Sequence, residues 1–128
     1  RIYQRKLFAE QEKRYIADPD IVLGNPMSPV LVADCKYKVL DGAPEHSDVY
    51  QILAHCDAFN SRYGLLLYPG EAREHQILGF SRNQVQIHWA TVRPKVLQDD
   101  LAAVVSSLLH GTAGSAPRRM RRPKRQSR

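Results

Sequence analysis

Three charged residues lie within the most apolar part of the chain. Residues 19–38 read PDIVLGNPMSPVLVADCKYK, and Asp20, Asp34 and Lys36 stand there among Ile, Val, Leu, Met and Ala. A buried strand normally excludes such side chains, because desolvating an unpaired carboxylate or ammonium group is costly. Their presence indicates a site where the charges face one another or a ligand.

A hairpin would bring the three charges together. The turn formers of GNPMSP predict that PDIVL and PVLVADCKYKVL are antiparallel strands. Because side chains alternate across a strand, Asp34 and Lys36 share one face, while Cys35 points to the other. Asp20 is then expected beside Asp34, and Lys38 on the same face one step beyond Lys36.

Two carboxylates and a lysine favour a hard divalent cation. Neighbouring acids raise each other's pKa unless a cation intervenes, and Mg²⁺ (or Mn²⁺) commonly binds one or two carboxylates plus water. We therefore predict that Asp20 and Asp34 bind the metal and that Lys36 acts on the attacking water, for phosphodiester hydrolysis. The alternative is a surface hairpin with a cross-strand ion pair worth about 0.2 to 1 kcal/mol. The apolar runs DIVL and VLVA argue against it.

These motifs resemble the PD-(D/E)XK nuclease superfamily: Pro19-Asp20 matches the first half of its pattern and Asp34-Cys35-Lys36 the second. PDIVL, VADCKYK and DVYQILAH, in this order, closely resemble the C-terminal nuclease region of McrC-type subunits of modified-cytosine restriction systems, over residues 10–60. The resemblance implies an α/β (α+β) fold with a restriction-endonuclease-like core, a mixed sheet flanked by helices. It also implies a Mg²⁺-dependent endodeoxyribonuclease.

The segment SDVYQILAHCDAFNSR is predicted to be a helix, with Ser47 or Asp48 as its N-cap. Its apolar side chains repeat with the helical period: Val49, Ile52, Leu53, Cys56 and Phe59. A polar stripe of Asp48, Gln51 and His55 runs beside them. The resemblance implies that Gln51 lies near the scissile phosphate and that Tyr50 contacts DNA. His55 stands where many relatives have tyrosine; the alternative, a surface or edge histidine without that residue's role, is favoured.

The resemblance also identifies what is missing. Relatives carry an acidic residue on a helix upstream of the first aspartate, and Glu10 and Glu12 are the only candidates in a chain that starts at Arg1. The region by which McrC-like subunits engage an AAA+ GTPase motor of the McrB type is not among the 128 residues, and the start at Arg1 predicts a fragment that lacks N-terminal parts. A non-catalytic DNA-binding module, or a degenerate nuclease fold, is therefore the alternative function.

The basic charge of the chain lies at its end. Residues 117–128 supply seven of the 19 Lys and Arg and no acid, so the net charge of +6 does not describe the preceding part. We predict a nuclease-like domain over residues 1–112 and a disordered basic tail over residues 113–128. Lys38 and the tail residues are expected to contact DNA phosphates: Arg118, Arg119, Arg121 and Arg122. The alternative is a solvated terminus without a role.

Further motifs narrow the function classes. Cys35 and Cys56 form no C-x-x-C pattern, which favours two free thiols in the cytoplasm. No stretch approaches the roughly 18 to 20 apolar residues of a membrane span. Phosphate-loop, nucleophile-elbow and H-E-x-x-H patterns are absent.

The remaining segments predict the element order β-β-α-β-β-β-α. LFAEQEKRYIA is either a short helix or, in its second half, a strand. Gly64 is expected to end the first helix, followed by the strands GLLLYPG, HQILGF and QVQIHWATV and the helix VLQDDLAAVVSSLLH.

Overall fold

The computed structural model describes residues 3–8 and 15–110 of the chain. Its centre is a five-stranded mixed sheet with the order β3-β4-β5-β7-β6. The elements are β3 Ile21–Asn25, β4 Ser28–Cys35, α1 His46–Phe59, β5 Tyr63–Pro69, β6 Glu74–Phe80, β7 Gln86–Val92, the 3-10 helix η1 Pro94–Val96 and α2 Leu97–His110. The central strands β4, β5 and β7 are parallel, while β3 and β6 are antiparallel edges. The predicted element order and mixed α+β class are confirmed.

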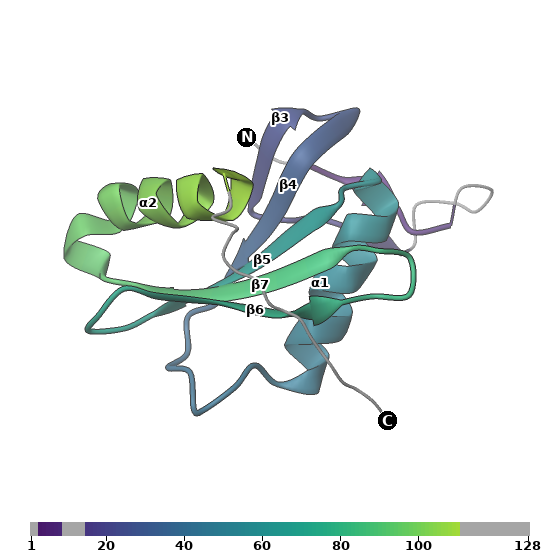
Figure 1. Cartoon of the computed structure of the whole chain (residues 1–128). Coiled ribbons are helices and arrows are strands. Elements are labelled where there is room, and N and C mark those ends of the chain that lie inside the picture. Colours follow the sequence, from purple (N-terminus) through teal and green to yellow (C-terminus); the bar gives the residue numbers. More distant parts are fainter. Residues whose placement is uncertain (1–2, 9–14, 111–128) are drawn as a thin grey trace.

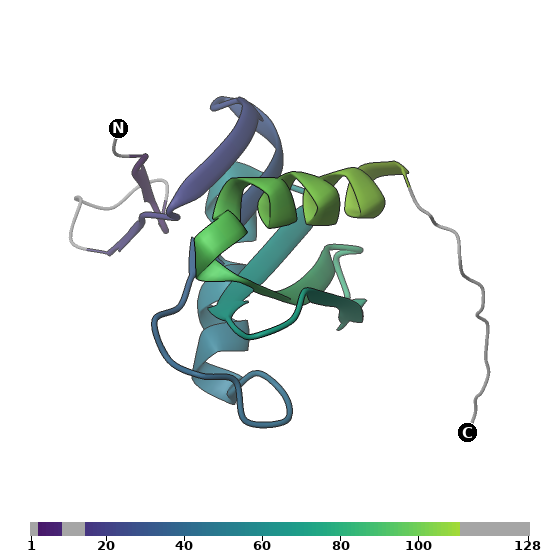
Figure 2. The same ribbon diagram turned by 90° about the vertical axis from the view of Figure 1, so that its left-hand side faces the viewer.

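The two helices cover opposite faces of the sheet, which gives the domain two apolar layers (Figure 1). On the α1 side, Val32, Leu66 and Trp89 of the sheet pack against Ile52 and Phe59 of the helix. The α2 side is formed by a second set: Leu31, Ala33, Leu65, Leu67, Ala90, Val104 and Leu108. Strand β5 is buried on both faces, which explains why its sequence GLLLY does not alternate. In the turned view of Figure 2, α2 runs across the sheet beside the β3–β4 hairpin.

Helix α1 packs directly against Gly64 of β5. A Cβ atom added there would lie 2.6 Å from Cys56 Sγ and 2.9 Å from both Ile52 Cγ1 and Ile87 Cδ1. Such distances are shorter than van der Waals contact, so the absence of a side chain at Gly64 sets the spacing between α1 and β5.

Gly64→Ala should therefore destabilise the fold by about 1 to 3 kcal/mol, because the added methyl group overpacks a closed interface. Gly79→Ala is the matched control, since a Cβ at Gly79 in edge strand β6 would meet nothing within 4 Å. Urea unfolding of the two variants measures the difference. Equal stabilities would contradict the close packing of α1 on β5.

Several predicted element ends are wrong. Strand β4 ends at Cys35, whose register partner is Leu67, and one further bond runs from the Lys36 N–H to the Leu67 carbonyl at 2.7 Å. The predicted strand continued to Leu40, but the chain leaves the sheet after Lys36. Lys38 therefore does not share a strand face with Lys36.

The ends of α1 also differ from the prediction. Its N-cap is Glu45, without a side-chain capping bond, in place of Ser47 or Asp48. Asp48 lies inside the first turn, where its carboxylate has other partners. The helix ends at Asn60, which adopts the left-handed conformation with φ of 57°, and not at Gly64. An asparagine tolerates this conformation better than most residues, which allows the chain to turn before β5.

The N-terminal segment forms a small second sheet. β1 Arg5–Lys6 pairs with β2 Ile16–Ala17 in antiparallel orientation, so the strand alternative is confirmed for Ile16–Ala17. This sheet lies against α1, and the Arg5 guanidinium lies 5.5 Å from the centre of the Phe59 ring. Residues 9–14, which include Glu10 and Glu12, lie outside the described residues.

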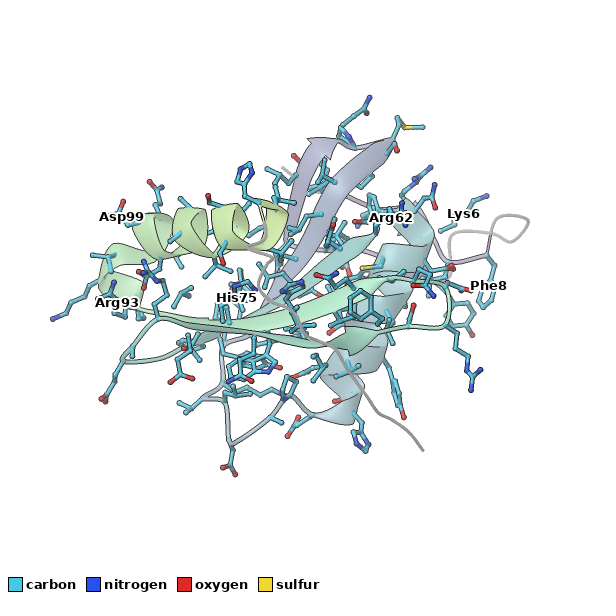
Figure 3. All side chains as sticks on the ribbon, viewed as in Figure 1. Lys6, Phe8, Arg62, His75, Arg93 and Asp99 are labelled. Carbon is cyan, nitrogen blue, oxygen red and sulfur yellow. The ribbon has the colours of Figure 1, made fainter. Side chains whose placement is uncertain are left out.

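Two histidines form a hydrogen-bonded pair on β6 and β7 (Figure 3, where His75 is labelled). His88 is 2% exposed. Its Nε2 lies 2.5 Å from Gln86 Oε1, and its Nδ1 lies 2.7 Å from His75 Nε2. An amide oxygen only accepts, so His88 Nε2 carries the proton and Nδ1 accepts one from His75. Burial, together with the charge of His75, lowers the pKa of His88 to about 3, and burial also lowers the pKa of His75.

This pair predicts that the free energy of unfolding decreases as the pH is lowered. In the unfolded chain His88 titrates near its ordinary pKa of about 6.5, so below that pH the unfolded state binds a proton that the folded state does not. His88 alone should remove about 2 kcal/mol of unfolding free energy between pH 7 and pH 5. Urea unfolding at both pH values should show a smaller loss in His88→Gln than in the wild type or in the exposed control His46→Gln. Equal losses in all three would contradict the buried neutral pair.

Candidate active site

Asp20 and Asp34 lie side by side, and the carboxylate of each accepts one backbone hydrogen bond across the hairpin. The Asp20 N–H donates to Asp34 Oδ1 at 3.2 Å, and the Cys35 N–H donates to Asp20 Oδ2 at 2.8 Å. The antiparallel register pair Ile21–Ala33 sets this arrangement, because Asp20 directly precedes Ile21 and Asp34 directly follows Ala33. The structure thus brings together the two carboxylates that the sequence pairs.

Lys36 and Gln51 form the second half of the site. The Lys36 Nζ donates a hydrogen bond to Gln51 Oε1 and lies 3.8 Å from Asp48 Oδ1. The lysine side chain is only 15% exposed, so most of its stem is packed against the protein. Lys36 therefore leaves the end of β4 and reaches the first turns of α1, two residues after Asp34.

The negative charge of the two carboxylates affects the pKa of nearby thiols. Burial raises the pKa of the Cys35 thiol, and the charges of Asp20 and Asp34 raise it further, against the opposing effect of Lys36. Burial, with a contribution from Asp34, raises the pKa of Cys56 on α1 to about 12. Both carboxylates thus lie close enough to Cys35, and Asp34 close enough to Cys56, to disfavour a thiolate there, and the same negative charge would favour a bound cation.

His55 contacts Asp34 from α1. The histidine is 4% exposed, so the alternative of a surface residue is wrong. Its Nε2 lies 3.1 Å from Asp34 Oδ2, yet among the described residues neither atom has a well-oriented hydrogen bond, and nor does His55 Nδ1. The sequence placed His55 on a polar stripe one turn after Gln51, but it did not indicate burial.

The donor set fits a hard divalent cation. Asp20 and Asp34 supply carboxylate oxygens, and Asp34 Oδ2 is buried without a hydrogen-bond donor, a condition that a bound cation would relieve. Across residues 3–8 and 15–110, no three His, Cys, Asp or Glu side chains are grouped to hold a metal ion. Water or the main chain would therefore complete the coordination, as is usual for Mg²⁺.

Asp48 is a site residue whose partners the sequence did not reveal. It is 6% exposed, and its Oδ2 accepts a hydrogen bond from the Tyr68 hydroxyl at 2.9 Å and lies 3.0 Å from Lys38 Nζ. Lys38 also contacts Glu45 Oε1 at 2.5 Å. Burial opposes ionisation of Asp48, but the hydrogen bonds from Lys38 and Tyr68 and the charge of Lys36 outweigh it and lower its pKa. Tyr68 lies 20 residues away on β5, which only the folded chain brings close.

The predicted DNA contacts lie around this site or beyond the described residues. Tyr50 is 68% exposed on α1, and its ring centre lies 6.2 Å from that of His46. Lys38 is partly exposed, with its ammonium group held by Glu45 and Asp48. The tail arginines at positions 118, 119, 121 and 122 lie outside the described residues, and their DNA contacts stay predictions, as do those of Lys38 and Tyr50.

Within residues 3–8 and 15–110, no helix has the length and apolar character needed to cross a bilayer.

Comparison with known proteins gives one family. No curated protein matches the chain significantly. A family described as McrBC 5-methylcytosine restriction system component matches residues 3–69, slightly more than half of the chain and the part that carries Asp20, Asp34, Lys36 and Gln51. The chain belongs to the family of McrBC 5-methylcytosine restriction system components.

Proposed function

We propose that this chain is a metal-dependent DNA endonuclease of the PD-(D/E)XK type, the phosphodiester-hydrolysing part of an McrC-like restriction component. The observation that carries the proposal is the hydrogen-bonded pair Asp20–Asp34, followed two residues later by a lysine that is held by Gln51. Family membership and the five-stranded mixed sheet with one helix on each face support it. A surface ion pair would not need a buried carboxylate such as Asp34, which is 4% exposed.

In this proposal Asp20 and Asp34 would hold Mg²⁺ or Mn²⁺, which when bound acts as a Lewis acid and favours the ionisation of water. Lys36 orients the attacking water and balances the negative charge that grows on the phosphate oxygens. Gln51 fixes the Lys36 ammonium group by accepting its hydrogen bond. As the water oxygen bonds to phosphorus it releases a proton to solvent, the bond from phosphorus to the leaving sugar oxygen breaks, and that oxygen takes up a proton from solvent.

The proposed partners rest on the same family assignment. We propose DNA as the substrate and an AAA+ GTPase motor of the McrB type as the partner, because the chain belongs to a restriction-system family. A non-catalytic DNA-binding module is the second candidate. The observation that favours it is that the Asp20 and Asp34 carboxylates each already accept a backbone hydrogen bond, as they would in a purely structural role.

The first test is metal dependence. Cleavage of DNA should require Mg²⁺ or Mn²⁺ and should stop in excess EDTA, because Asp20 and Asp34 cannot activate water by themselves. Ca²⁺ should support DNA binding with little hydrolysis, since it coordinates loosely and activates water poorly. Asp34→Asn should weaken Mn²⁺ binding in calorimetry. Full cleavage in excess chelator would refute the metal mechanism, and binding without cleavage in every metal would favour the second candidate.

The second test separates Lys36 from Lys38. Lys36→Ala and Lys36→Met should each lower the cleavage rate on the order of 100-fold or more while leaving metal binding intact, because they remove the charge beside the phosphate. Lys38→Ala should cost less, since its ammonium group is engaged by Glu45 and Asp48. Single-turnover rates and melting temperatures measure both effects. If the Lys36 and Lys38 variants cut at the same rate, Lys36 has no catalytic role.

A further inference from the structure

We propose that Asp48 is a positioning residue that holds Lys36 in its catalytic place and uses Lys38 as its counter-ion. The proposal rests on the nuclease function proposed above and adds a residue to it. It is carried by the arrangement of two lysines around one buried carboxylate.

The two oxygens of Asp48 face different partners. Oδ1 lies 3.8 Å from Lys36 Nζ, whereas Oδ2 lies 3.0 Å from Lys38 Nζ and accepts the Tyr68 hydroxyl at 2.9 Å. Tyr68 is 1% exposed and belongs to the central strand β5, so it ties the carboxylate to the rigid centre of the sheet. Asp48 itself lies in the first turn of α1 and is 6% exposed. Its position is therefore fixed from both sides.

Because Lys38 lies closer to Asp48 than Lys36 does, the two lysines interact with its negative charge to different extents. Lys38 makes the short contact and neutralises most of the Asp48 charge, with Glu45 as a second partner. Lys36 lies too far from Oδ1 for a hydrogen bond but close enough for Coulomb attraction. The Lys36 ammonium group is therefore attracted toward Asp48 without forming a direct ion-paired hydrogen bond, and its positive charge remains available for a phosphate.

A lysine needs such guidance. Its four-carbon stem is flexible, and its ammonium group is a point charge without the fixed geometry of a guanidinium. Gln51 holds one donor of Lys36 through a neutral amide, and Gln51 is itself exposed. A buried carboxylate on the neighbouring turn adds the second restraint. A misplacement of a catalytic group by about 1 Å can cost on the order of 100-fold in rate.

The test compares three conservative variants in the full chain. Asp48→Asn keeps the size of the side chain and removes its charge, and it should lower kcat at least tenfold while KM for DNA and the Mn²⁺ affinity in calorimetry stay within about twofold. Glu45→Gln is the matched control, because Glu45 forms an ion pair with Lys38 and not with Lys36. It should keep the wild-type kcat. Tyr68→Phe removes only the hydroxyl that anchors Asp48 and should give an intermediate kcat.

A second readout does not depend on cleavage. The side-chain NMR signals of Lys36 at Nζ and Cε should indicate a restrained ammonium group in the wild type and in Glu45→Gln, and a freely rotating one in Asp48→Asn. If Asp48→Asn misfolds by melting temperature, Tyr68→Phe provides both measurements.

The outcomes separate the two proposals. A wild-type protein that cuts DNA, combined with equal kcat in Asp48→Asn and Glu45→Gln, would overturn the role of Asp48 and leave the nuclease intact. A wild-type protein that does not cut in Mg²⁺ or Mn²⁺ would refute the nuclease. In that case unchanged Lys36 signals in Asp48→Asn would also overturn the positioning contact.

Discussion

The backbone hydrogen bonds that the Asp20 and Asp34 carboxylates accept across the hairpin are the constraint on which the candidate site depends. Each carboxylate accepts a backbone N–H from the other strand or its next residue, so neither can move without breaking the end of the β3–β4 ladder. A hydrogen bond to a charged acceptor is stronger than a neutral one and also offsets part of the desolvation cost. The hairpin therefore fixes the acid pair through the main chain, before any ligand binds.

Helix α1 supplies the other half, and its position depends on Gly64. The close contact of Cys56 and Ile52 with this glycine sets the height of the helix above the sheet. The residues of one polar stripe then fall into different environments. Gln51 stays exposed and meets Lys36, whereas Asp48 and His55 are buried and meet Tyr68 and Asp34. One glycine in β5 thus influences three contacts of the site.

Local patterns predicted the carboxylate pair well, because a turn and a two-residue period determine which side chains of a hairpin are neighbours. The apolar stripe of α1 and the continuous apolar run of β5 were readable for the same reason. The end of β4 at Cys35 was not readable: β5 continues to Pro69, but the chain leaves its side after Lys36, and no local pattern marks that departure. Sequence patterns also did not predict the burial of His55 or the hydrogen bond from Tyr68 to Asp48, because both arise from packing between segments that no periodicity connects.

The two apolar layers differ in what they carry. Asp34, His55 and Asp48 all contact partners on the α1 side, while the layer under α2 is mainly apolar, with His88 buried on the same face of β7 as Ala90, and contains none of the proposed catalytic residues. Natural proteins often lose activity when they are stabilised, because the active site itself tolerates little change. Here the layer beneath α2 offers positions for stabilising substitutions that lie apart from the proposed catalytic residues. Substitutions there can alter the robustness of the scaffold over evolution, or in engineering, while the chemistry on the opposite face is left undisturbed.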